Sequence, residues 1–217
     1  MLYIVSTPIG NLKDITLRAL EILKEVDLIA CEDTRHTRKL TSHYGIKTPL
    51  TSYFEYNKLT KGEYLIKLLK EGKDVALVSD SGTPGISDPG FSLIKLAIDN
   101  LIPISVVPGP VGLIAALVLS GKPTHKFIFE GFLSNKRAAR IKRLKELSTQ
   151  DRTIVLYESP HRLVKLFEDI LEALGDREVV CARELTKKFE EVKRERTSRL
   201  LEHFRNIKPK GEFIVIL

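Results

Sequence analysis

Short apolar runs alternate with longer stretches of helical periodicity along the whole chain. The runs span four to six residues and are rich in Val and Ile, which is typical of buried strands. In the first half they predict strands at residues 2–6, 27–31, 48–52, 75–79 and 102–107. Between them, apolar residues at helical spacing, such as Ile15, Ala19, Ile22 and Val26, predict amphipathic helices. Five strands with crossover helices indicate an open, largely parallel α/β sheet.

The second half repeats the alternation and predicts a second α/β domain. Strands are expected at residues 127–131, 153–157, 179–182 and 213–217, and helices near 136–147, 161–174 and 198–206. Residues 121–124 (GKPT) follow an apolar helix, and Gly and Pro interrupt regular structure, so we place a hinge there. The chain is therefore expected to form two domains, residues 1–120 and 124–217.

Three of the first-half strands run into loops rich in Gly and Pro. These loops are residues 7–11 (TPIGN), 80–90 (DSGTPGISDPG) and 108–110 (PGP). Loops at the carboxyl ends of parallel strands lie on one edge of the sheet, where open α/β folds bind their ligands. Glycine lets the backbone approach a ligand closely, and proline restricts its path. We therefore predict a ligand-binding site at this edge, chiefly in the loop 80–90.

Motifs for several common ligands are absent. The sequence has neither GxxxxGK[ST] nor GxGxxG after a strand, and its five histidines show no metal-binding spacing. Cys31 and Cys181 lie too far apart in the sequence to indicate a zinc site or a disulfide framework. The longest apolar run, residues 111–119, is about half of a membrane span, and no signal peptide is evident. We expect no metal and no membrane segment, and a mature chain that begins at Met1 in the cytoplasm.

Basic residues exceed acidic ones by seven, and the whole excess lies in the second half. Residues 1–110 hold 13 basic and 13 acidic side chains. Residues 136–145 hold six Lys and Arg and no acid. A helix with this composition is typical of a surface that binds a polyanion such as nucleic acid. The alternative is a basic face that contacts only solvent. The candidate contacts are Lys136, Arg137, Arg140 and Arg143.

Seven blocks of sequence, in order, resemble one known family. They are STPIGNL (6–12), CEDTR (31–35), the loop 80–90, VPGP (107–110), GFL (131–133), YESPHR (157–162) and ARELTK (182–187). On these blocks the chain resembles the bacterial ribosomal RNA small subunit methyltransferase I group of the tetrapyrrole methylase superfamily. The resemblance implies two α/β domains of tetrapyrrole methylase type with S-adenosylmethionine in the cleft between them. It also implies a homodimer that methylates a cytidine ribose 2′-hydroxyl in 16S ribosomal RNA, either free or within the small ribosomal subunit.

Carried over position by position, the resemblance places donor-binding residues in both halves of the chain. They are Pro8, Gly82, Thr83, Gly85, Ile86, Ser87, Val111, Gly112, Tyr157, Glu158 and Glu212. Relatives usually have Ser-Ala where this chain has Val111-Gly112. A side-chain hydrogen bond to the donor is therefore not expected at that place.

Methyl transfer to an alcohol requires alignment and a proton acceptor. Alignment of the reacting atoms can supply roughly 7–11 kcal/mol, and an acceptor about 10²–10⁴ in rate. Glu32 and Asp33 follow the strand 27–31 and are the candidate acceptors, with Arg35 holding a phosphate. Asp33 could instead cap the next helix. Two rival functions stay open: the same fold and donor acting on a tetrapyrrole or a protein residue, and a non-catalytic RNA-binding ribosome assembly factor.

Overall fold

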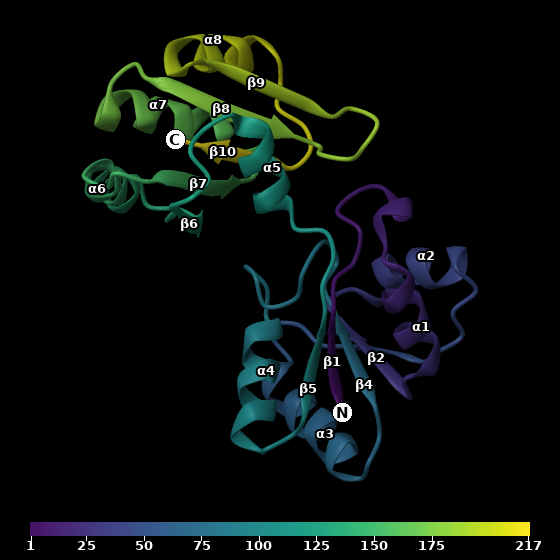
Figure 1. The fold of residues 1–217 in the computed structure, drawn as a ribbon. Helices are drawn as coiled ribbons and strands as arrows, with labels where there is room; N and C mark the ends of the chain where they lie inside the picture. Colours follow the sequence, from purple (N-terminus) through teal and green to yellow (C-terminus); the bar gives the residue numbers. More distant parts are fainter. The chain divides into compact units, whose positions relative to one another are not determined.

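The computed structural model describes residues 1–217 and divides them into two compact units. Unit 1 is Met1–Val111 and unit 2 is Gly112–Leu217. Figure 1 shows that each unit has its own sheet with helices packed against it. Each sheet has five strands, and each unit has its own buried apolar core. No helix in either unit is both long enough and apolar enough to span a membrane.

Unit 1 is built on a parallel sheet with the strand order β3-β2-β4-β1-β5. Its strands are β1 (Leu2–Val5), β2 (Leu28–Cys31), β3 (Leu50–Ser52), β4 (Val75–Val78) and β5 (Ile104–Val107). Ile4 of β1 lies opposite Leu77 on one side and Val106 on the other, in parallel register. The prediction of an open parallel sheet is confirmed, and the strands start or end within two residues of the predicted bounds.

Helices cover both faces of this sheet. They are the 3-10 helix η1 (Leu12–Asp14) and the α-helices α1 (Leu17–Glu25), α2 (Thr34–His43), α3 (Lys58–Lys70) and α4 (Gly90–Asp99). Side chains alternate along each strand, so Ile4 packs with residues of α3 and α4 and Val5 packs with residues of α1 and α2. Because both faces are buried, these strands appear in the sequence as continuous apolar runs.

Unit 2 has a mixed sheet with the order β6-β7-β10-β8-β9. Its strands are β6 (Phe127–Phe132), β7 (Thr153–Glu158), β8 (Glu178–Arg183), β9 (Glu191–Arg196) and β10 (Phe213–Ile216). β6 runs parallel to β7, and all other pairings are antiparallel. β9 was not predicted, because its sequence EVKRER holds a single apolar residue.

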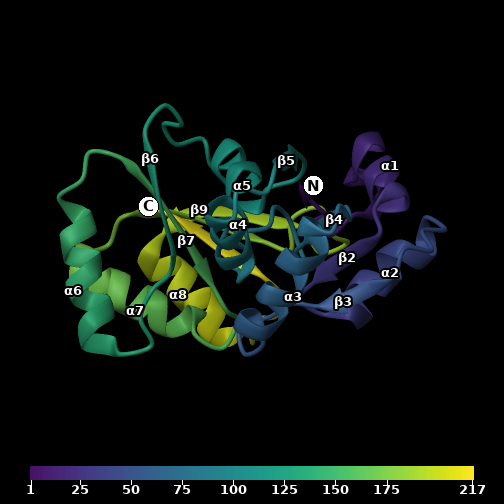
Figure 2. The same cartoon turned by 90° about the horizontal axis from the view of Figure 1, so that it is seen from below.

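The helices of unit 2 explain where the chain divides. They are α5 (Gly112–Ser120), α6 (Arg137–Ser148), α7 (Leu163–Leu174) and α8 (Thr197–Asn206). α6, α7 and α8 pack side by side over one core (Figure 2), whereas α5 packs against β8, β9 and β10. Leu113, Ala116 and Leu117 of α5 are buried. The division therefore falls before α5, at Val111/Gly112, and not at the predicted hinge 121–124.

Candidate functional site

The three Gly- and Pro-rich loops of unit 1 are joined to one another by hydrogen bonds. Thr7 and Gly82 exchange backbone hydrogen bonds of 2.9 and 3.2 Å. The hydroxyl oxygens of Ser6 and Thr83 lie 2.8 Å apart, and that of Thr83 lies 3.4 Å from the carbonyl oxygen of Pro110. Three segments that are distant in the sequence thus form one continuous edge at the carboxyl ends of β1, β4 and β5.

The loop 80–90 is held in one conformation by its own contacts. Gly82 and Gly85 have φ angles of 84° and 89°, a left-handed region in which a side chain would be strained. A Cβ atom at Gly85 would also lie only 3.1 Å from Cδ1 of Ile94. The Asp88 carboxylate accepts hydrogen bonds from the backbone N–H groups of Gly85 and Gly90, at 2.8 and 2.7 Å. This edge therefore presents a preorganised backbone.

The predicted donor-binding residues of unit 1 lie along this edge. Pro8, Thr83, Gly85 and Ile86 are half-buried, Ser87 is exposed with a φ angle of 63°, and Gly82 is buried. Val111, half-buried, is the last residue of the unit.

Glu32 lies beside the loop 80–90. The backbone N–H of Asp33 donates to the Asp80 carboxylate at 3.1 Å, which ties the β2–α2 connection to the loop. Partial desolvation and the neighbouring carboxylates of Asp80, Asp88 and Asp33 raise the pKa of Glu32. Asp80 is a residue whose importance we did not predict, although its place two residues after a buried strand was a usable signal. Glu32 thus has the higher proton affinity expected of a general base.

Asp33 caps a helix. Its carboxylate accepts from the backbone N–H of Arg35 at 2.8 Å at the start of α2, and it holds the Arg35 guanidinium at 2.7 Å. These hydrogen bonds with Arg35 keep the pKa of Asp33 well below its usual range. The alternative interpretation of Asp33 as a helix cap is confirmed, and its low proton affinity makes it the weaker candidate acceptor. The Arg35 side chain is 89% exposed and open to a further anion.

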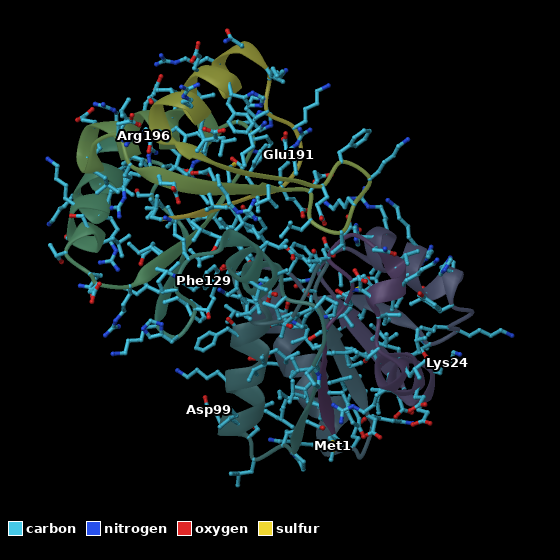
Figure 3. The ribbon with its side chains drawn as sticks, turned by 45° about the horizontal axis from the view of Figure 1, so that its top comes forward. Met1, Lys24, Asp99, Phe129, Glu191 and Arg196 are labelled. Atoms are coloured by element: carbon cyan, nitrogen blue, oxygen red, sulfur yellow. The ribbon has the colours of Figure 1, made fainter.

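In unit 2, Tyr157 lies in an aromatic cluster near the start of α5. Its ring meets Phe129, labelled in Figure 3, and Phe132 edge to face, with centroids 4.9 and 5.7 Å apart. Burial raises the pKa of Tyr157. A Cβ atom at Gly112 would lie 3.8 Å from the Tyr157 hydroxyl oxygen and 3.4 Å from Cδ1 of Ile214. The start of α5 thus lies close to Tyr157 of β7 and Ile214 of β10, and a Cβ atom at Gly112 would fit there in ordinary van der Waals contact.

The Glu158 side chain is buried and engaged within unit 2. Its carboxylate accepts from the Ser159 N–H at 2.8 Å and lies 3.2 Å from Nε of Arg162. Burial raises the pKa of Glu158. The Arg162 guanidinium also donates to the carbonyl oxygen of Leu133 at 2.6 Å. Arg162 therefore anchors the end of β6 to the end of β7, a role that its position in the block YESPHR did not reveal.

Glu212 precedes β10, is exposed and belongs to an ion-pair cluster whose other members, Lys187 and Glu184, are half-buried. Its carboxylate lies 3.1 Å from the Lys187 ammonium, which is also 3.0 Å from Glu184. The Glu184 carboxylate in turn accepts from the Glu212 backbone N–H at 3.0 Å. These bonds join the loop before β10 to the loop between β8 and β9.

The basic segment that begins α6 differs from the prediction at one residue. Arg140 is only 4% exposed, pairs with the buried carboxylate of Asp169 and donates to the carbonyl oxygen of Ser134 at 3.0 Å. It is a buried structural cation and is not available to an RNA phosphate. Its partner comes from α7, which the spacing within the segment could not show.

The other arginines of this segment are exposed but carry acidic partners from elsewhere in unit 2. Arg137 binds Asp169 at 3.1 Å and also Glu172. Arg143 binds Glu130 at 2.7 Å and Glu146 at 3.0 Å. Lys136 is exposed and has no ion pair. The lack of acids within residues 136–145 is thus offset by acids that the fold brings to them.

Sequence comparison shows similarity over the full chain. A family model described as "Tetrapyrrole (Corrin/Porphyrin) Methylases" matches residues 1–201. A Thermotoga maritima protein named ribosomal RNA small subunit methyltransferase I is 50% identical over 100% of this chain and 97% of its own length. Proteins of the same name from Synechocystis and Bacillus subtilis are 47% and 45% identical over 100% of this chain, and 78% and 74% of their own lengths.

Solved structures with the same fold have more distant sequences. A cobalt precorrin-4 methyltransferase of cobalamin biosynthesis superposes with a TM-score of 0.75 at 21% identity, covering 99% of this chain and 93% of that one. A diphthine synthase gives a TM-score of 0.75 at 17% identity, covering 100% of this chain and 88% of that one. At these identities the similarity establishes the fold alone.

Proposed function

Because this chain belongs to the tetrapyrrole methylase family, we propose that it is an S-adenosylmethionine-dependent methyltransferase acting on a cytidine ribose 2′-hydroxyl of 16S ribosomal RNA. The names of its relatives support small-subunit ribosomal RNA as the substrate. The observation that carries the proposal is the hydrogen-bonded convergence of the three unit 1 loops beside Glu32.

The residues of this edge fit the donor. Gly82 and Gly85 adopt φ angles of 84° and 89°, which favour glycine, so the loop holds a backbone conformation that other residues would strain. Pro8, Thr83, Ile86 and Ser87 provide half-buried or exposed apolar and hydroxyl groups along the same edge. When bound, S-adenosylmethionine supplies an electrophilic methyl group. The role of this edge is to hold its ligand in one orientation and to exclude water from it.

The chain itself contributes a proton acceptor. A ribose hydroxyl loses its proton when its oxygen is methylated, and we propose that the Glu32 carboxylate accepts it. The raised pKa of Glu32 makes this carboxylate more basic than an ordinary one. Asp33 holds Arg35 in place by its cap and its ion pair, and Arg35 is then positioned to bind a phosphate of the substrate.

We retain the unit 2 residues as proposed donor contacts, with roles limited by their surroundings. The Glu158 carboxylate is occupied by Ser159 and Arg162, so we assign its contribution to the backbone. Tyr157 and Gly112 offer an aromatic ring and an open backbone, while Glu212 is exposed and paired with Lys187. Lys136, Arg137 and Arg143 remain proposed RNA contacts. A homodimer and a cytoplasmic location are part of the same proposal.

The test combines donor binding with identification of the methylated product. Calorimetry with S-adenosylmethionine should show one binding event per chain. Incubation with tritium-labelled donor and small-subunit RNA or subunits from cells that lack this protein should label the RNA, and mass mapping should place the methyl group on a cytidine ribose. Donor binding without RNA labelling would favour a tetrapyrrole or protein acceptor. RNA binding without donor binding would favour an assembly factor.

A further inference from the structure

The exposed face of α2 is basic and lies next to the proposed acceptor. Its exposed residues are Arg35, His36, Arg38, Lys39, Ser42 and His43. Thr37, Leu40 and Thr41 form the buried face, and the helix contains no Asp or Glu. α2 begins two residues after Glu32, on the edge where the three loops meet.

The cations of α2 are less neutralised than those of α6. The ion pair between Arg35 and Asp33 is the one that involves this helix, and Arg38 and Lys39 have none. On α6, by contrast, all three arginines are paired with acids of other segments or of α6 itself. The unpaired cations of α6 are its lysines, Lys142 and Lys145, whereas the unpaired Arg38 and Lys39 of α2 lie in the segment that carries the proposed acceptor.

We propose that the exposed face of α2 binds the phosphate backbone of the substrate RNA, with Arg38 and Lys39 as positioning residues. The inference rests on the proposed function. Arg38 and Lys39 follow Arg35 at helical spacings of three and four residues, so the three side chains share one side of the helix. Four residues advance a helix by about 6 Å, which spreads the positive charge along the strand it binds. Because Glu32 and α2 belong to one continuous segment, phosphates bound there hold the RNA strand at the edge that carries the acceptor, a contribution to binding that is equal before and during methyl transfer.

The chemistry of this face favours RNA over other anionic partners. A helix that binds a membrane surface inserts an apolar face, and the apolar face of α2 is buried in the core of unit 1. Protein interfaces are enriched in aromatic residues and depleted in Lys at their centre, and this face exposes no apolar side chain. Binding of a polyanion requires neither an apolar face nor aromatic residues. It requires exposed cations that can neutralise phosphates along the strand.

The experiment compares two charge reversals of equal size in the full-length protein. Arg38→Glu/Lys39→Glu removes the proposed contacts. Lys70→Glu/Lys95→Glu, on α3 and α4 of the same unit, is the matched control, since those lysines are exposed, have no ion pair and belong to no proposed site. Affinity for small-subunit RNA transcribed in vitro is measured between 50 and 300 mM salt. The α2 variant should bind about tenfold more weakly near 0.15 M salt, with a log-log salt slope shallower by about 1.4 for two single-strand phosphate contacts. Donor affinity and the control variant should match the wild type.

The neutral variant Arg38→Gln/Lys39→Gln keeps helix propensity and should lose affinity in the same direction. In methyl transfer, both α2 variants should raise KM for RNA and leave kcat at saturating RNA unchanged. Unaltered RNA affinity and salt slope in the α2 variants, with a wild-type protein that methylates RNA, would overturn the inference and leave the proposed function standing. An equal loss in the Lys70→Glu/Lys95→Glu control would overturn it as well, because the effect would then reflect net charge. If the wild-type protein does not methylate RNA, the proposed function itself fails.

Discussion

Glu32 and Asp33 are neighbours in the chain, yet their carboxylates have opposite electrostatic surroundings. Three acidic residues and partial desolvation raise the pKa of Glu32, while hydrogen bonds with Arg35 lower the pKa of Asp33. A base must be ionised to work, so methyl transfer should fail on acidification at a higher pH than the ordinary Glu pKa of about 4.3 would give. The sequence identifies both carboxylates as candidate acceptors. The opposite shifts of their pKa values follow only from the contacts that the fold gives them.

Replacement of Glu32 tests this assignment. Glu32→Gln keeps the size of the side chain and removes the acceptor, so kcat should fall by about 10²–10⁴ while donor affinity is unchanged. It should also abolish the acidic limb of the pH–rate profile, which is measured by initial rates at saturating donor and RNA. Asp33→Asn is the control, since Asn also caps helices and should keep most of the rate. Normal rates in Glu32→Gln would assign the proton acceptor elsewhere.

Gly85 offers a second test at the scale of one residue. Gly85→Val places a branched side chain at a φ angle of 89° and a Cβ atom 3.1 Å from Cδ1 of Ile94, so the loop 80–90 must change conformation. Donor binding measured by calorimetry should be lost. Gly72→Val is the matched control, because Gly72 has a φ angle of 86° with open space around it, outside the loop. Both variants should lose roughly 1–2 kcal/mol of stability. Equal donor binding by the two would contradict the assignment of the loop.

At the scale of elements, the buried ion pair between Arg140 of α6 and Asp169 of α7 joins the two helices. Arg140→Ala should lower the free energy of unfolding by about 3–5 kcal/mol, because it leaves the buried Asp169 carboxylate with only Arg137. Chemical denaturation of the full chain measures this. Arg140→Met/Asp169→Leu should recover part of the loss, since it removes both charges. Lys142→Ala, at an exposed position of the same helix, should change stability by less than about 0.5 kcal/mol. A comparable loss of unfolding free energy in Arg140→Ala and Lys142→Ala would refute a specific role for Arg140.

The type of an element could be predicted where its own sequence pattern decides it. It was missed where contacts with residues distant in the sequence decide it. The apolar runs of β1, β4 and β10 indicate strands because their residues are buried on both faces. β9 has the sequence EVKRER and is a strand only because β8 pairs with it at the edge of the sheet. Arg140 appeared to be an exposed cation for the same reason: Asp169, which neutralises it, lies on another helix. Of the candidate site, the loops were predictable from their composition, but the tie between Asp33 and Asp80 was not.

At the scale of the whole molecule, the position of α5 decides where the two units separate. A fragment of residues 112–217 should unfold cooperatively, because α5 stays with β8, β9 and β10. A fragment of residues 121–217 removes the buried Leu113, Ala116 and Leu117 and should be less stable by several kcal/mol or fail to fold. Circular dichroism during thermal unfolding compares them. Equal stability of the two fragments would instead support the predicted domain boundary at residues 121–124.

The strand order of the two sheets also sets the sequence of events during synthesis. β1, the first strand of unit 1 in chain order, lies between β4 and β5, so about a hundred further residues must be made before both of its neighbours exist. In unit 2 the last strand, β10, is inserted between β7 and β8. In unit 2, β6 can pair with β7 at once, but in both units the sheet is completed only when its last strand arrives, β5 in unit 1 and β10 in unit 2. Until then the nascent chain exposes apolar, unpaired strand edges that invite aggregation or chaperone binding.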